Sequence, residues 1–251
     1  MQNHVELENK GFMIRGMLHL PERDRCKVPG VVIFHGYTGN KMEPHFILVK
    51  LSRALEKLGI ASARFDFYGS GESEGTFQDM TPDSELRDAK TILDYMRSLD
   101  AIDKNRIGLC GLSMGGYIAG ITAGDYRDYV KALCLLAPAG NIKEIFESDM
   151  AEENKIGEGL FDVDGLILNA KARESAAKID HIKRTSMFDK KVCIIHGDKD
   201  ESVPYSVVQN YRNALKNSEF HNIEGADHTF NSAKWEDEVI KIVTRFFKRE
   251  L

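Results

Sequence analysis

A single serine stands among glycines in the stretch GLSMG, residues 111–115. The run 106–110 before it is short and apolar, which is typical of a buried strand, and the residues from Gly115 onward favour a helix. Ser113 would then lie on a tight strand-to-helix turn, where glycines two positions before and after it avoid collisions with Cβ atoms. Because such a turn exposes the hydroxyl, the stretch predicts a nucleophile.

A serine hydroxyl becomes an effective nucleophile only when a histidine accepts its proton and a carboxylate orients that histidine. His228 follows the serine in chain order and lies in a short loop between the last strand pattern and the last helix pattern. The loop GDKD, residues 197–200, supplies the carboxylate. Asp198 and Asp200 are both chemically suitable, and the residues alone leave the choice between them open.

Acyl transfer also needs N–H groups that stabilise negative charge on the substrate oxygen. The backbone N–H of Met114, directly after the serine, would supply one. The loop HGYTG, residues 35–39, follows an apolar run and would supply the other from the backbone of Tyr37. A second glycine-rich stretch, residues 66–75, lacks the spacing of a phosphate-binding loop and carries two glutamates. It predicts a structured turn beside the site.

The elements that must position these residues alternate between strands and helices. An antiparallel hairpin is expected at 3–20, before the alternation, and a last helix at 233–248. Such alternation predicts a parallel sheet with helices on both faces. Strand patterns occupy 30–34, 60–65, 106–110, 131–136, 192–196 and 219–223, and helical patterns occupy 44–58, 83–99 and 114–125.

The alternation breaks at residues 141–187, which are rich in Lys, Glu, Asp and Ala with scattered apolar side chains. No convincing strand pattern occurs there, so we expect short helices inserted into the fold. No repeat or low-complexity linker divides the chain. The sequence therefore predicts one α/β domain over residues 1–251 that carries one insertion.

The composition narrows the classes of partner. The chain has 251 residues, 42% of them hydrophobic, and a formal net charge of -5. Lys and Arg are scattered, which argues against nucleic acid and anionic membranes, and no apolar stretch suits a membrane span. The first residues do not resemble a secretory signal, so we expect a cytoplasmic protein. Four isolated cysteines, three of them in apolar runs, favour buried thiols over disulfides or a metal site.

Five motifs follow one another along the chain: HGYTG at 35–39, D-x-x-G-x-G-x-S at 66–73, GLSMGG at 111–116, HGDKDESVP at 196–204 and ADH at 226–228. Taken together, these motifs resemble those of the α/β-hydrolase superfamily over nearly the whole chain. The nearest likeness is to the bacterial cinnamoyl or feruloyl esterases, intracellular enzymes that release hydroxycinnamic acids from esters.

This resemblance implies the α/β-hydrolase fold and assigns several positions. The family signature G-x-x-D-x-x-V implies that Asp200 is the acid, and the family's oxyanion residues correspond to Tyr37 and Met114. Residues 141–187 occupy the place of a cap over the acyl pocket. The cap contains Phe146 and Phe161, the expected substrate contacts, but no Tyr or Trp that would bind a phenolic hydroxyl.

The implied activity is that of a serine carboxylic-ester hydrolase that works through an acyl-enzyme and needs no cofactor and no metal. Its partner would be a small-molecule ester, and a homodimer is compatible with the sequence. The same triad would also serve a monoacylglycerol lipase, a thioesterase or a peptidase, because the fold does not fix the acyl group. A non-catalytic ligand-binding member of the fold is less favoured, since such a protein would be expected to lose a triad residue.

Overall fold

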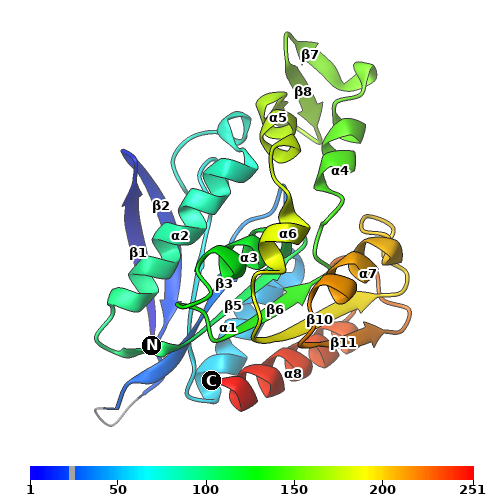
Figure 1. Ribbon diagram of the computed structural model, residues 1–251. Coiled ribbons are helices and arrows are strands. Elements are labelled where there is room, and N and C mark those ends of the chain that lie inside the picture. The colour runs from blue at the N-terminus through cyan, green and yellow to red at the C-terminus, as the bar shows by residue number, and fades with distance from the viewer. Residues whose placement is uncertain (23–25) are drawn as a thin grey trace.

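The computed structural model describes residues 1–22 and 26–251, and an eight-stranded sheet forms its centre (Figure 1). The strand order is β1-β2-β4-β3-β5-β6-β10-β11, and neighbours from β4 to β11 are parallel. The β1–β2 and β2–β4 pairs are antiparallel, which confirms the predicted hairpin and the mostly parallel sheet. The strands are β1 (Gln2–Asn9), β2 (Phe12–His19), β3 (Val28–Phe34), β4 (Ala61–Phe65), β5 (Ile102–Leu112), β6 (Ala132–Leu136), β10 (Lys191–Gly197) and β11 (Ser218–Ile223).

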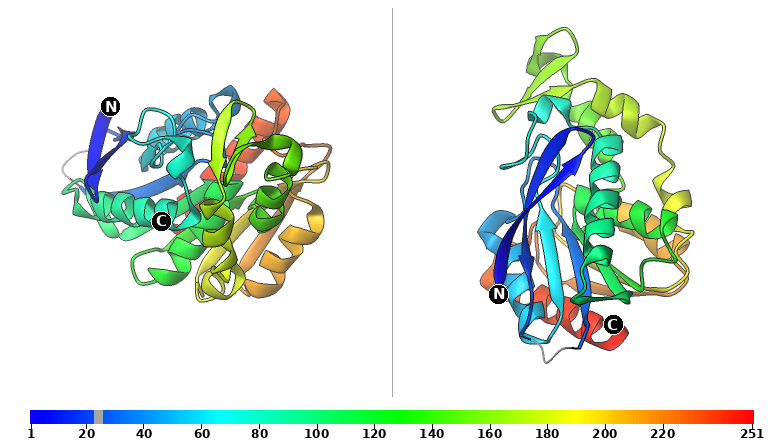
Figure 2. Two further views of the ribbon diagram at one scale, coloured as in Figure 1. Left: turned by 90° about the horizontal axis from the view of Figure 1, so that it is seen from above. Right: turned by 90° about the vertical axis from the view of Figure 1, so that its left-hand side faces the viewer.

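Helices cover both faces of the sheet, as the alternating pattern predicts (Figure 2). One apolar core lies under α1 and α8, where Cys110, Cys134 and Cys193 are buried, and the other lies under α2 and α3. Within the described residues, no helix has the length and apolar composition that crossing a bilayer requires. The helices are α1 (Ile47–Lys57), α2 (Pro82–Ser98), α3 (Met114–Asp125), α7 (Tyr205–Ala214) and α8 (Ala233–Glu250), with short 3₁₀ turns η1 (Pro44–Phe46) and η2 (Phe77–Asp79).

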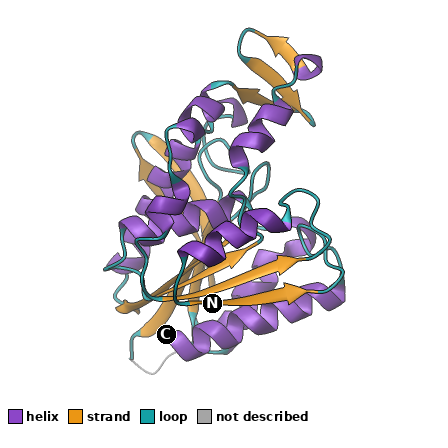
Figure 3. Ribbon diagram, turned by 45° about the vertical axis from the view of Figure 1, so that its right-hand side comes forward, coloured by secondary structure: helices purple, strands orange, loops and turns teal. Residues whose placement is uncertain are grey.

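The segment between β6 and β10 rises above the carboxyl edge of the sheet (Figures 1 and 3). The expectation of helices alone is wrong here, because a three-stranded antiparallel sheet lies in its middle. Its strands have only three or four residues and turn at glycines with positive φ, too short for an alternating pattern to appear in the sequence. The elements are α4 (Ile142–Asp149), η3 (Glu152–Asn154), β7 (Lys155–Gly157), β8 (Leu160–Val163), β9 (Leu166–Asn169), α5 (Lys171–Ala177) and α6 (His181–Thr185).

The last helix of this segment, α6, packs against α3 of the main body. Two glycines of α3 permit the contact: a methyl group on Gly124 would lie 1.9 Å from the carbonyl oxygen of Arg184. A methyl group on Gly120 would lie 2.8 Å from the hydroxyl oxygen of Thr185. All residues of α3 up to Gly124 are buried, since the sheet, α2 and α6 surround this helix. The glycines of α3 therefore serve close packing as well as the turn at its start.

Helix α3 lies so close to β3 at Gly115 that we expect the structure not to tolerate an added methyl group there. At Gly115 that group would lie 2.4 Å from the backbone oxygens of Phe34 and His35, which cannot move aside easily. Gly115→Ala should lower the free energy of unfolding by ~2 kcal/mol or more. The control Gly157→Ala, where the methyl would lie 3.6 Å from Leu160, should change it by less than ~0.5 kcal/mol. Urea denaturation of both variants measures the difference, and equal stabilities would contradict this packing.

Candidate active site

Ser113 occupies the tight turn between the end of β5 and the start of α3. Its φ of 56° and ψ of -120° lie in a region that non-glycine residues rarely adopt. A methyl group on Gly111 would lie 2.0 Å from the backbone oxygen of Gly115, so both flanking glycines are needed for the chain to reverse here. Strained backbone of this kind persists where the surrounding structure holds it in place, and it is common at active sites.

Three side chains predicted from the sequence form one hydrogen-bonded chain. The Nε2 of His228 lies 2.8 Å from the Ser113 hydroxyl oxygen, and its Nδ1 lies 2.7 Å from Oδ2 of Asp200. Because a carboxylate only accepts, Nδ1 carries the proton and Nε2 is free to accept the serine proton. The Asp200 side chain is fully buried, whereas the histidine ring is 17% exposed. This arrangement can perform acyl transfer.

The loop after β10 holds Asp200 in place through its other oxygen. Oδ1 accepts hydrogen bonds from the backbone N–H groups of Ser202, at 3.0 Å, and Val203, at 2.8 Å. His196 braces the same loop by donating from Nε2 to the carbonyl oxygen of Val203, at 2.9 Å. Burial lowers the pKa of His196, which keeps this brace neutral. This role of His196 could not be predicted, because the sequence shows only a histidine at the end of a strand pattern.

Asp198, the second aspartate of the loop, points elsewhere. Its Oδ1 accepts from the backbone N–H of Gly225 at 2.7 Å, and its Oδ2 accepts from the side chain of Asn222 at 3.3 Å. It therefore ties the loop after β10 to the segment that leads to His228. Of the two aspartates left open by the residues, only Asp200 contacts the histidine.

The loop after β3 is fixed by a buried histidine. His35 donates from Nδ1 to the carbonyl oxygen of Gly36, at 2.8 Å, and accepts at Nε2 from the backbone N–H of Phe67, at 3.0 Å. Burial lowers its pKa, so the ring is neutral and joins this loop to the turn that begins at Asp66. Met114 is the first residue of α3, and the first N–H groups of a helix have no partner within it.

The side chain of Tyr37, predicted only as a backbone donor, lies among aromatic residues. Its ring is 5.5 Å from that of Phe77 in η2 and 5.3 Å from that of Phe146 in α4, measured between ring centres. Its hydroxyl is buried, and burial together with the Asp149 carboxylate raises its pKa. Phe161 lies in β8, where it pairs with Leu168 of β9, and it packs against the apolar core that contains Phe146. Phe77 could not be predicted as part of this group, because no motif in the sequence marks it.

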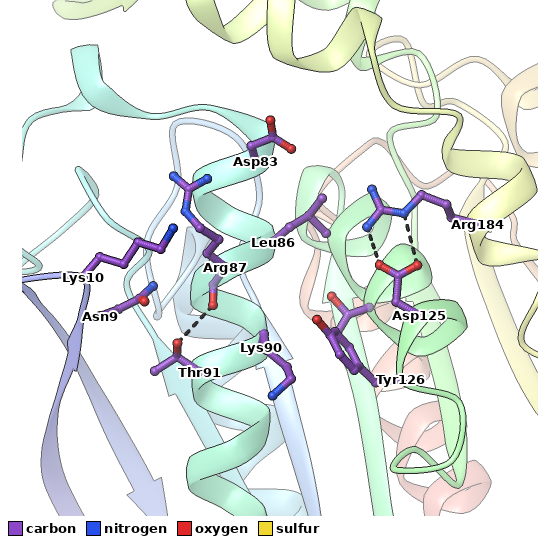
Figure 4. A pocket seen from close by; sticks show the side chains of 11 residues that line it. Asn9, Lys10, Asp83, Leu86, Arg87, Lys90, Thr91, Asp125, Tyr126 and Arg184 are labelled. Atoms are coloured by element: carbon purple, nitrogen blue, oxygen red, sulfur yellow. Dashed lines mark hydrogen bonds and ion pairs between the residues drawn. The ribbon is translucent and has the colours of Figure 1, made fainter.

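A separate surface cavity of about 380 Å³ lies between α2 and α3 (Figure 4). Charged side chains line it, and several are already matched: Arg184 pairs with Asp125, and Lys90 pairs with Asp94. The cavity shares no residue with the cluster around Ser113.

One trio of metal-ligand types lies together within the described residues: Cys193, Glu219 and His221 on β10 and β11. Glu219 already pairs with Arg249 at 2.8 Å and lies 3.4 Å from the ring of His221. None of the three belongs to the cluster around Ser113.

Comparison with known proteins identifies the relatives of this chain. The model of the prolyl oligopeptidase family matches residues 49–251. Est1E from Butyrivibrio proteoclasticus, in a structure with ferulic acid bound, is 29% identical with a TM-score of 0.88 over 98% of each chain. The putative esterase YitV of Bacillus subtilis is 24% identical over 89% of this chain and 92% of its own length. These likenesses confirm the predicted fold class and the resemblance to α/β-hydrolase esterases.

Other relatives match over shorter segments. The thiohydrolase AneE of Aspergillus aculeatus is 28% identical over 57% of this chain and 42% of its own length. Two versions of an uncharacterized 31.7 kDa protein of Escherichia coli match over 35% and 30% of their lengths. The chain thus spans well under half the length of several curated relatives.

The two aspartates of the GDKD loop provide a matched pair of variants. Asp200→Asn should lower kcat by about 10⁴, because an amide at this position would leave His228 in the wrong tautomer. Asp198→Asn removes a loop contact but no contact with the histidine, so kcat should fall by less than about tenfold. Steady-state hydrolysis of p-nitrophenyl acetate by both folded variants measures this. If Asp198→Asn showed the larger loss, the two roles would be reversed.

Proposed function

The chain belongs to the prolyl oligopeptidase family, within the α/β-hydrolase superfamily, and we propose that it is a serine esterase that cleaves hydroxycinnamoyl esters. The reaction type rests on one observation: the hydrogen-bonded chain from Ser113 through His228 to Asp200. The three groups have the order and the geometry that acyl transfer through a serine requires.

In the proposed reaction, Oγ of Ser113 attacks the ester carbonyl carbon while Nε2 of His228 takes the hydroxyl proton. The carbonyl oxygen becomes negative and accepts hydrogen bonds from the backbone N–H groups of Tyr37 and Met114. When the intermediate collapses, His228 returns the proton to the leaving alcohol and the acyl group stays on the serine. A water molecule, deprotonated by the same histidine, then releases the acid and regenerates the serine. Asp200 stabilises the positive imidazole that forms in both halves.

Two observations support an aromatic acyl group. Est1E, the structural relative described above, is seen with ferulic acid bound. In this chain, the loop that carries the oxyanion donor brings together the rings of Tyr37, Phe77 and Phe146. Each apolar group well buried contributes about 1.5 to 3 kcal/mol, so a flat arylpropenoyl group gains most of its binding energy from such rings. The phenolic hydroxyl of such an acid would bind near the carboxylate of Asp149, a cap residue that interacts with the Tyr37 hydroxyl.

We further assign residues 141–187 to a cap on a single domain of residues 1–251. The rise of α4 and the three-stranded sheet above the carboxyl edge supports this role (Figure 1). Phe146 would be the cap residue closest to the acyl group, with Phe161 contributing from farther away. Thioester hydrolysis is the second candidate, favoured by the match to the thiohydrolase AneE.

A panel of acyl substrates tests the proposed function. Methyl ferulate and methyl p-coumarate should be hydrolysed with similar kcat/KM, because ring shape outweighs one methoxy group. Both should exceed long-chain p-nitrophenyl esters and monoacylglycerols by at least about 100-fold, since a rigid aromatic acid and a long flexible chain require different pockets. A profile that peaks on long-chain esters would favour a lipase, and one that peaks on acyl-coenzyme A esters would favour a thioesterase.

Substitution of the two cap phenylalanines tests the location of the acyl group. Phe146→Ala should lower kcat/KM for methyl ferulate by roughly tenfold or more, as expected for one lost aromatic contact. Because acetate does not reach the ring, p-nitrophenyl acetate hydrolysis should change less. Phe161→Ala serves as the matched control in the same cap and should have the smaller effect on ferulate. Equal losses on both substrates would mean that Phe146 only supports the fold.

A further inference from the structure

A buried glutamate that no motif identifies lies behind the loop HGYTG. Oε1 of Glu43 accepts a hydrogen bond from the backbone N–H of Gly36 at 2.6 Å, and the residue is only 9% exposed. Burying a carboxylate is unfavourable unless strong hydrogen bonds compensate for the lost water. The burial of the Glu43 carboxyl group, with a short hydrogen bond to the N–H of Gly36 in this loop, therefore needs a physical explanation.

The glycines of the loop create room for this carboxyl group. A methyl group on Gly39 would lie 2.3 Å from Oε1 of Glu43. On Gly36, a methyl would lie 3.4 Å from the same oxygen and 3.1 Å from Cβ of Ser113. The carboxyl group and the serine thus both lie close to the side of Gly36 from which a side chain would project, so the backbone of this glycine is tightly packed there.

The backbone around Glu43 is strained. Its φ is 60°, and His45 and Phe46, two and three residues later, have φ values of 55° and 62°. Non-glycine residues avoid this left-handed region, and a group of three is retained only where other contacts hold it. A contact from the ring of His45 to the side chain of Asn231, at 2.9 Å, ties the strained segment to the loop that carries His228.

We propose that Glu43 is a positioning residue that holds the Gly36 backbone so that the next N–H, that of Tyr37, faces the oxyanion. Through the same carboxylate it stabilises the positive charge that His228 acquires during the reaction. This proposal rests on the esterase function proposed above.

If the charge of Glu43 contributes to the reaction, kcat should depend on the protonation of this carboxyl group, whereas a purely structural role would give no such pH dependence. Burial raises its pKa to about 7, against the opposing effects of the Gly36 N–H and of His228. His228 is the charged side chain that acts on this pKa, whereas the nearby Lys41 pairs with Asp66 and Glu72. The carboxyl group of Glu43 therefore loses its charge at a higher pH than an exposed glutamate does. Any contribution of its charge to kcat must fade as the pH falls.

The test measures kcat and KM for p-nitrophenyl acetate with Glu43→Gln and Glu43→Ala across the neutral range. The glutamine keeps an acceptor for Gly36 but no charge, so kcat should fall roughly three- to tenfold at about pH 8.5. Below about pH 6 the wild type is itself neutral at this position, and the two enzymes should converge. The alanine removes the acceptor as well, so kcat should fall by about 100-fold at every pH with KM nearly unchanged. Glu56→Gln, at the far end of α1, is the control and should follow the wild type.

Two results would overturn the proposal: a Glu43→Gln variant whose ratio to wild type does not change with pH, or a Glu43→Ala variant with wild-type kcat. If the alanine variant does not fold, the pH dependence of the glutamine variant decides. Failure of the esterase function is distinguishable, because the wild type itself would then not hydrolyse the ester. In that case, the rate at which a fluorophosphonate inactivates each Glu43 variant reports on the same oxyanion donors.

Discussion

The candidate site depends on how closely α3 approaches the ends of the strands beside it. Gly115 lies against the backbone oxygens of Phe34 and His35, with no room for a side chain, and Gly111 lies against Gly115 itself. This contact forces the chain to reverse within one residue, which leaves Ser113 at a positive φ with its hydroxyl 2.8 Å from Nε2 of His228. Met114, the first residue of α3, follows directly, and the first N–H groups of a helix find no acceptor within its regular i to i−4 ladder.

The parallel sheet brings the other groups to that point. The carboxyl ends of parallel strands share one edge, so the loops after β3, β5, β10 and β11 meet although they lie far apart in the chain. Three of these four loops are held by polar side chains outside the chain of Ser113, His228 and Asp200. His35 fixes the first, His196 the third, and Asp198 joins the third to the fourth. Neutral histidines suit this role, because a buried charge would need a partner of its own.

The parts of the molecule that could be predicted from the sequence are those that depend on local patterns of residues. The strand and helix alternation, the turn at Ser113 and the loop of His228 are all encoded within short stretches. The three-stranded sheet at 155–169 was not predictable, because strands of three or four residues carry too little alternation to distinguish them from loops. Glu43 was missed for another reason. Its importance comes from contacts across a loop, and nothing in the residue type marks a carboxylate as buried.

The central claim is that Ser113 is the nucleophile of a serine hydrolase, and active-site labelling tests it most directly. A fluorophosphonate probe reacts only with a serine that a neighbouring base activates. Mass spectrometry of the labelled wild-type protein should place one adduct on Ser113, with loss of ester hydrolysis in proportion to labelling. Ser113→Ala, folded as judged by circular dichroism, should show neither labelling nor turnover. Labelling at another serine, or full turnover by Ser113→Ala, would contradict the account.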